Sequence, residues 1–153
     1  MSLFEPSFGY VAFAASALSF HCYSQSFYIS KLRKEYGLLY PDQGDGRYSQ
    51  KLTDQQWEKF NCYQRAHHNY LESLTPTITW LLLGGIKYPY ISTGLAAVIF
   101  VARQFYCSGY RKRGPSGRFI GGYISGAGVV GLFVTAMASS IKITKAIAHL
   151  ISY

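Results

Sequence analysis

The sequence predicts an all-α membrane protein built as a bundle of four membrane-spanning helices. Of its 153 residues, 14% are charged, against about 25% in a typical soluble domain. The charged residues crowd into the gaps between long apolar stretches. Four of these stretches reach the length of about 20 residues that a helix needs to cross a bilayer. We expect a single domain over residues 1–153, with spans at about 7–30, 65–86, 91–110 and 119–141.

The first span is followed by a polar linker that leads into a second helix. The span ends at the basic letters KLRK, and the linker carries turn signals at YPDQGDG. The letters TDQQWEKF then predict the start of a helix capped by Thr53 or Asp54. Because the second span begins only near Arg65, this helix is expected to start well outside the membrane.

The remaining spans follow at short intervals. Only a few residues separate the second span from the third, which predicts an antiparallel helical hairpin. The third span ends at the basic letters RKRGPSGR, after which the fourth begins. In the fourth span, Gly122 and Gly126 form a spacing of small residues that lets membrane helices pack closely.

The positions of lysine and arginine predict the direction of the chain, since cytosolic loops of membrane proteins are enriched in both. Ten of them lie on the side that holds the linkers 31–59 and 111–118: Lys31, Arg33, Lys34, Arg47, Lys51, Lys59, Arg111, Lys112, Arg113 and Arg118. Only Lys87, Lys142 and Lys145 lie on the opposite side. We therefore expect the linkers in the cytosol and both termini across the membrane.

Several classes of function are disfavoured by the sequence. The stretch MSLFEPSFGY has no lysine or arginine, so no cleavable signal peptide is predicted. Cys22, Cys62 and Cys107 show neither metal-ligand nor paired spacing, which predicts reduced packing residues. No metalloprotease, dinucleotide or phosphate-loop motif is present. The basic residues sit at the edges of apolar runs instead of along one stripe, which argues against a nucleic-acid partner.

Two predicted spans carry polar faces at the same membrane depth. On the second, Arg65, Asn69 and Glu72 fall within about 60° of arc at 100° per residue. The third repeats the arrangement at spacings of three and four, with Arg103, Tyr106 and Tyr110. The second span begins and the third ends on the cytosolic side, so the two faces meet. The basic end of the first span and Arg118 reach the same level, and ionisable groups in a membrane are costly enough to indicate a site.

The chemistry of these side chains suits a small zwitterion. Arginine binds carboxylates through two parallel hydrogen bonds, and the carboxylate of Glu72 binds an ammonium group. A molecule with several carboxylates and one amine fits, and glutathione is such a molecule. An arginine near its sulfur would stabilise the thiolate. For Arg33, Lys34, Arg111 and Lys112 the alternative is snorkelling to the lipid headgroups. His68 lies near the Arg65 face, whereas His67 points to the other side of the helix.

The quoted motifs resemble one family. FNCYQRAHHNYLE resembles the Arg-x-x-x-Asn-x-x-Glu signature of the MAPEG superfamily, the membrane-associated proteins in eicosanoid and glutathione metabolism. ISKLRKEYGLLYP, ARQFYCSGY and GYRKRGPSGR are most similar to its branch of microsomal glutathione S-transferases of the third type. The resemblance covers about residues 30–125 at motif level and all four spans in layout. The chain departs from the family at three positions. Leu74 stands where a tyrosine is usual shortly after the glutamate, Pro76 remains of a proline pair, and His68 replaces a position often held by glutamine.

The resemblance implies a homotrimer with glutathione bound as co-substrate between adjacent subunits near the cytosolic face, and no metal. It implies that Arg118 is the catalytic residue that polarises the thiol. The implied glutathione-binding residues are Arg33, Lys34, Arg65, His68, Asn69, Glu72, Arg103, Tyr106 and Tyr110.

The same resemblance implies a membrane-bound glutathione transferase and glutathione-dependent peroxidase. Its second substrate would be a lipophilic electrophile or a lipid hydroperoxide that arrives through the membrane lipid. Two alternatives stay open, a cysteinyl-leukotriene synthase and a non-enzymatic lipid-binding membrane scaffold. The family default for location is the endoplasmic reticulum, with the outer mitochondrial membrane as the alternative.

Overall fold

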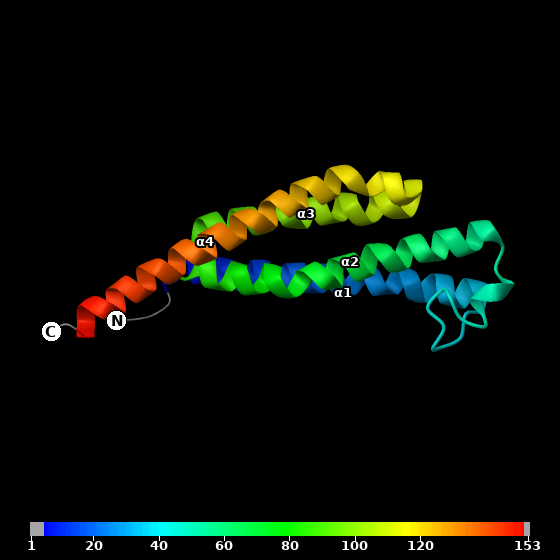
Figure 1. Cartoon of the computed structure of the whole chain (residues 1–153), viewed down its shortest axis with the longest axis horizontal. Helices are drawn as coiled ribbons and strands as arrows, with labels where there is room; N and C mark the ends of the chain where they lie inside the picture. Colours follow the sequence, from blue (N-terminus) through cyan, green and yellow to red (C-terminus); the bar gives the residue numbers. More distant parts are fainter. Residues whose placement is uncertain (1–4, 152–153) are drawn as a thin grey trace.

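The computed structural model describes residues 5–151, and these form helices joined by short turns and one longer loop, with no strand. The prediction of an all-α protein is therefore confirmed. Four long helices follow one another up and down (Figure 1), and two short 3-10 helices lie in the connections. The elements are α1 Phe8–Tyr36, η1 Ser49–Lys51, α2 Asp54–Gly85, α3 Pro89–Arg113, η2 Gly114–Arg118 and α4 Phe119–Ile151.

The helices pack as a bundle in which α2 and α3 form the centre. Each of these two packs against both α1 and α4. The core changes character along the bundle: Val11, Leu81, Ile99 and Leu132 fill one half. The half towards the α3–α4 turn is lined instead by cysteine and tyrosine side chains, among them Cys107, Tyr70, Tyr106 and Tyr110. Buried phenol and thiol groups are therefore gathered in this second half.

Helix length and surface agree with a membrane environment. The four helices have 29, 32, 25 and 33 residues, more than the ~20 that a bilayer requires. Among the described residues, the helical run Pro89–His149 is long and apolar enough to cross a membrane, since it contains an 18-residue stretch with a mean hydropathy of 1.7. Large apolar side chains such as Phe13, Phe20 and Ile120 are exposed on the outside, as expected where lipid or another subunit covers them. The four-span arrangement stays a prediction.

The start of α2 agrees with the sequence prediction. The Thr53 side chain accepts a hydrogen bond from the Gln56 backbone N–H at 3.3 Å, and the Gln56 side chain accepts one from the Thr53 backbone N–H at 3.0 Å. This capping box satisfies two backbone donors that a helix start leaves unpaired. With α2 starting at Asp54, eleven residues precede Arg65, so this part of the helix is about 16 Å long at 1.5 Å per residue.

The loop between α1 and α2 is organised around the buried carboxylate of Asp42. Its two oxygens accept backbone N–H bonds from four loop residues, Gly44, Gly46, Tyr48 and Ser49, at 2.7 to 3.1 Å. Burial opposes ionisation of this carboxyl, but the backbone donors outweigh it and hold the pKa of Asp42 well below its usual range. Arg33 donates to the Asp42 carbonyl, and Trp57 on α2 donates to the Gly44 carbonyl at 2.7 Å. The loop is thus fastened to both helices.

Close packing of α3 against α4 uses other glycines than those predicted. A Cβ on Gly121 would lie 2.4 Å from the Tyr106 backbone nitrogen, whereas a Cβ on Gly126 would have nothing within 4 Å. A Cβ on Gly122 would lie 3.5 Å from the Tyr106 ring, which is ordinary contact. The close approaches are at Gly117 of η2 and at Gly121 and Gly128 of α4, so the contact face is shifted by one residue at Gly121. This close approach sets Arg118 beside the end of α3.

Candidate functional site

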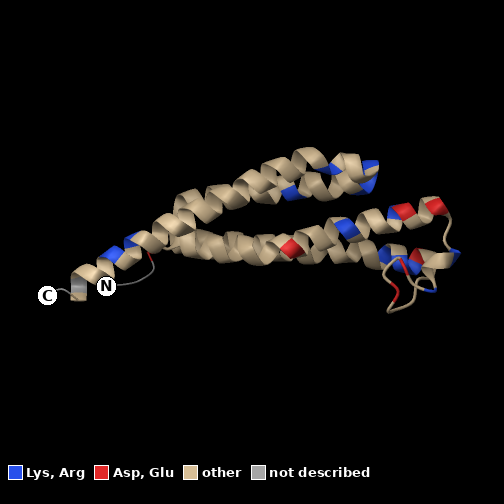
Figure 2. Cartoon of the chain, in the orientation of Figure 1, with Lys and Arg blue, Asp and Glu red and all other residues tan. Residues whose placement is uncertain are grey.

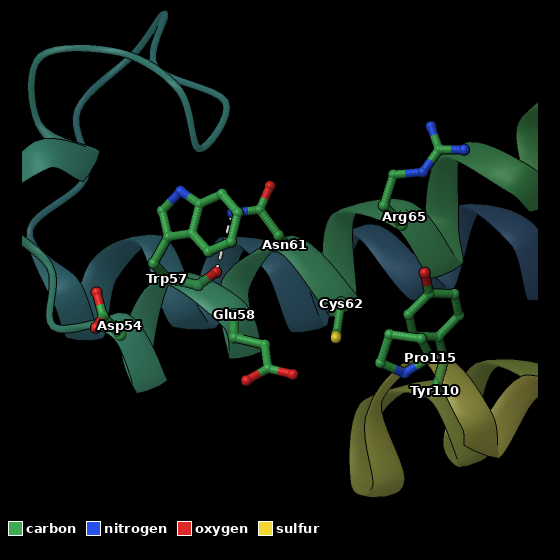
Figure 3. Close-up of a pocket in the computed structure, with 8 residues that line it drawn as sticks. All are labelled: Asp54, Trp57, Glu58, Asn61, Cys62, Arg65, Tyr110 and Pro115. Atoms are coloured by element: carbon green, nitrogen blue, oxygen red, sulfur yellow. Dashed lines mark hydrogen bonds between the residues drawn. The ribbon is translucent and has the colours of Figure 1, made fainter.

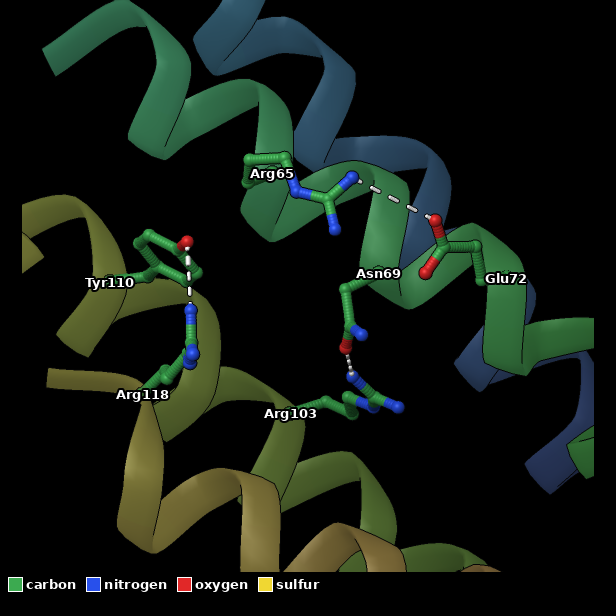
Figure 4. A network of polar contacts seen from close by, with 6 residues as sticks. All are labelled: Arg65, Asn69, Glu72, Arg103, Tyr110 and Arg118. Atoms are coloured by element: carbon green, nitrogen blue, oxygen red, sulfur yellow. Dashed lines mark hydrogen bonds and ion pairs between the residues drawn. The ribbon is translucent and has the colours of Figure 1, made fainter. Parts of the chain in front are cut away.

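Six predicted site residues converge on the space between α2 and the α3–α4 turn (Figure 4). They come from three elements: Arg65, Asn69 and Glu72 from α2, Arg103 and Tyr110 from α3, and Arg118 from the end of η2. Side chains of three separate segments therefore lie near one another in this set, and Tyr106 joins it through its ring contact with Tyr110 at 5.9 Å between centroids.

Arg103 cross-links α3 to α2. Its side chain is only 6% exposed, and it donates from Nη1 to the Asn69 side-chain oxygen at 2.8 Å and from Nη2 to the Ser73 hydroxyl at 2.6 Å. Its guanidinium carbon lies 5.1 Å from the centroid of the Tyr70 ring and 5.3 Å from that of Tyr106. Two hydrogen bonds and two aromatic faces therefore hold this buried cation in one place.

Arg118 and Tyr110 form a second pair, and Tyr110 lies seven residues beyond Arg103 on α3, about 10 Å further along at 1.5 Å per residue. The Arg118 Nη1 donates to the Tyr110 hydroxyl oxygen at 3.0 Å. The guanidinium also lies 5.3 Å from the Tyr110 ring centroid and 5.5 Å from that of Phe119. Since the phenol oxygen accepts from arginine, its own proton can be donated to a ligand. The pair offers two donors, one of them charged, to a single anion.

Arg65 and Glu72 form a loose pair that a ligand can replace. Their nearest charged atoms are 3.9 Å apart, and the side chains are 58% and 60% exposed. An exposed pair at this distance contributes about 0–1 kcal/mol. Little is therefore lost when Arg65 takes a ligand carboxylate and Glu72 takes a ligand ammonium instead.

A cavity of about 480 Å³ opens beside these residues, within the ~300–1,000 Å³ typical of small-molecule sites. Its lining is shown in Figure 3: Asp54, Trp57, Glu58, Asn61, Cys62, Arg65, Tyr110 and Pro115. Burial, and then the Glu58 carboxylate, raise the pKa of the Cys62 thiol, so this cysteine carries its proton at neutral pH. It therefore does not compete as an anion with a ligand held by Arg65.

Arg33, Lys34 and His68 lie away from this group within one chain. Arg33 and His68 border a second cavity of about 190 Å³, together with Ser26, Ile29, Ser30, Tyr40, Gln43, Gln64 and His67. Arg33 faces this side because its guanidinium is held by the loop, 4.1 Å from the Tyr40 ring centroid. Its Nε and Nη2 are buried without a hydrogen-bond partner, and Lys34 is exposed. The predicted set thus divides into two groups.

The structure adds residues that the sequence did not single out. Ser73 and Tyr70 both contact Arg103. Ser73 follows Asn69 by four residues, so the same face arithmetic that selected Asn69 would have found it. Tyr70 gave no such signal, because its side chain reaches Arg103 through the core.

A comparison with families of known proteins gives one match. A family model described as the MAPEG family matches residues 11–138. The matched range runs from the second turn of α1 into α4, and it contains every residue of both groups described above.

Proposed function

Because the chain belongs to the MAPEG family, we propose that it is a membrane-bound glutathione transferase with glutathione-dependent peroxidase activity. The family comprises membrane-associated proteins in eicosanoid and glutathione metabolism and includes glutathione transferases and related enzymes. Within it, the motifs around Arg33, Arg103 and Arg118 support the branch of the third type. The endoplasmic reticulum is the proposed location, with the site near the cytosolic face.

The observation that carries the proposal is the Arg118–Tyr110 pair beside an open cavity that Arg65 also lines. Arg65 and Glu72 would bind a carboxylate and the ammonium of glutathione. Arg118 and Tyr110 would donate to its sulfur, where negative charge develops as the thiol ionises.

The size of this effect is sufficient. A free thiol has a pKa of about 8.5, and lowering it by two units takes about 2.7 kcal/mol. A hydrogen bond to a charged group contributes about 1.5–3 kcal/mol. One arginine donor, assisted by a phenol, therefore suffices to give a thiolate at neutral pH.

Two reactions follow from a thiolate at this place. With an electrophile, the sulfur forms a bond to carbon and the leaving group departs with its electron pair. With a lipid hydroperoxide, the sulfur attacks the terminal oxygen and the O–O bond breaks, leaving an alkoxide that takes a proton. A second glutathione then converts the oxidised sulfur to the disulfide and releases water.

We propose a homotrimer as the active assembly. Arg33 and His68 line a different cavity from Arg65. In a trimer, the Arg33 and His68 face of one subunit could reach the ligand held by Arg65 of its neighbour. Crosslinking in mild detergent should yield trimers, and a product limited to monomers would contradict this assembly.

Equilibrium binding of glutathione to the purified protein tests the function most directly. The transferase should bind glutathione and show thiolate absorbance in the ultraviolet near neutral pH. A lipid-binding scaffold should bind none, and that result would refute the proposal. A leukotriene synthase would bind glutathione as well, so turnover with a leukotriene epoxide against a simple aromatic electrophile separates the two enzymes.

A further inference from the structure

His21 is a titratable side chain in the middle of α1 that the proposed reaction does not use. It lies in an apolar span, where a polar side chain is costly and calls for partners. It has two: Nδ1 lies 3.2 Å from the Tyr70 hydroxyl of α2, and Nε2 lies 2.9 Å from the side-chain oxygen of Gln104 on α3. The ring also packs on Phe100, with centroids 4.6 Å apart. His21 therefore connects α1 to both central helices.

The partners of His21 select one arrangement of protons. With a proton on Nε2, the neutral ring donates to the Gln104 oxygen, and Nδ1 then accepts from the Tyr70 hydroxyl. The other acceptor near that hydroxyl is the Leu18 carbonyl at the longer distance of 3.4 Å. Gln104 thus fixes the tautomer, and the tautomer makes His21 the acceptor for Tyr70.

Tyr70 carries this contact to the candidate site. Its side chain is 2% exposed, so its hydroxyl has no access to water and needs a protein partner. Its ring lies below the Arg103 guanidinium, which donates to Asn69 and Ser73. A continuous series of contacts therefore runs from His21 through Tyr70 and Arg103 to Asn69.

We propose that His21 is a positioning residue for the candidate glutathione site, acting through Tyr70 on Arg103. The inference rests on the proposed function, since glutathione is taken as the ligand. The hydrogen bond between His21 and the Tyr70 hydroxyl fixes the orientation of the Tyr70 ring. The contact with Arg103 depends on that orientation, because a guanidinium is attracted to the face of an aromatic ring. Holding Arg103 and Asn69 in place before the ligand arrives lowers the ordering cost of binding.

Two amide variants separate the two bonds of His21. In His21→Asn the amide reaches the place of Nδ1 and can keep the bond to Tyr70. In His21→Gln it reaches the place of Nε2 and can keep only the bond to Gln104. We expect glutathione affinity within twofold of the parent for the Asn variant and three- to tenfold weaker for the Gln variant and for His21→Phe, the size of one lost hydrogen bond.

The maximal rate gives a second readout. Tyr110, which pairs with Arg118, lies about 10 Å further along α3 than Arg103, so kcat at saturating glutathione should stay within twofold in all three variants. The matched control is Tyr23→Phe. Tyr23 lies two residues after His21 on α1, its side chain is exposed and its ring contacts Phe27, so this variant should bind glutathione like the parent. Equal affinity of the Asn and Gln variants, or unchanged affinity in His21→Phe, would overturn the proposal.

A thermal unfolding cycle in detergent tests the contacts without glutathione. His21→Phe and Arg103→Met both disturb contacts of Tyr70, so the melting change of the double variant should be smaller than the sum of the two single changes. Additive changes would overturn the coupling. A parent protein that binds no glutathione would refute the proposed function, while this cycle would still decide whether His21 acts on Arg103.

Discussion

Removing the Arg118 side chain should raise the pKa of bound glutathione while leaving its affinity nearly unchanged. In the structure Arg118 donates to the Tyr110 hydroxyl at 3.0 Å, and a sulfur that accepts from both groups would lie about 4 Å from the guanidinium carbon. At that separation a unit charge contributes about 4 kcal/mol with an effective dielectric constant of 20. Arg118 is partly exposed, and water screening reduces this to about 1.4–2.7 kcal/mol, or one to two pKa units.

The assay is thiolate absorbance of bound glutathione against pH, with affinity measured in parallel. Arg118→Ala should move the titration upwards by one to two units and slow turnover at neutral pH, because the lost interaction grows only as charge develops. Lys112→Ala is the matched control, since Lys112 is an exposed cation at the end of α3 and its loss changes the net charge equally. If glutathione bound to Arg118→Ala ionises at the same pH as in the parent, Arg118 does not stabilise the thiolate, and Arg103 becomes the candidate for that role.

Three further outcomes are expected. Arg65→Ala should weaken glutathione binding by about 10- to 100-fold with kcat little changed, because this carboxylate contact exists in ground and transition states alike; a loss confined to kcat would contradict it. Asp42→Ala should lower the free energy of unfolding by about 2–3 kcal/mol through buried N–H groups left unpaired, and exposed Asp45→Ala should not. Since the pKa of Asp42 is depressed, its contribution to stability is present above the unfolded pKa of about 3.9 and is lost as pH falls below it. Gly121→Ala should lower the melting temperature in detergent far more than Gly126→Ala, since only the first Cβ meets α3 backbone; equal effects would refute the packing.

The sequence predicted features that depend on local chemistry or on helical periodicity. The start of α2 followed from the capping signal, which left Thr53 and Asp54 as alternatives, and the structure has Thr53 as the cap with both hydrogen bonds of a capping box. Arg65, Asn69 and Glu72 share a face because a fixed 100° per residue places them there. The sequence also placed the polar faces of α2 and α3 at the same depth, and the structure adds the specific contact between Arg103 and Asn69.

Features that depend on packing between helices were not accessible in the same way. The sequence placed Arg33 with the other cations by depth, but the loop carbonyl of Asp42 turns it to the other side of α2. The glycine contact fell on Gly121 and not on Gly122 because the crossing of α3 and α4 decides which face is covered. His21 did offer a signal, as a lone ionisable residue in an apolar span, but its partners on α2 and α3 come from the three-dimensional arrangement.

The uneven distribution of charge along the bundle has a kinetic consequence. Most blue residues in Figure 2 gather at the end with the α1–α2 loop and the α3–α4 turn, in a chain of net charge +8. Such a one-sided field draws small anions towards that end and raises their encounter rate, and dissolved salt weakens the attraction. The association rate of an anionic ligand should therefore fall as ionic strength rises, while its dissociation rate changes much less. The field would then accelerate the arrival of an anionic ligand from water at one end of the molecule. It would not change the encounter rate of an uncharged lipid that moves within the bilayer.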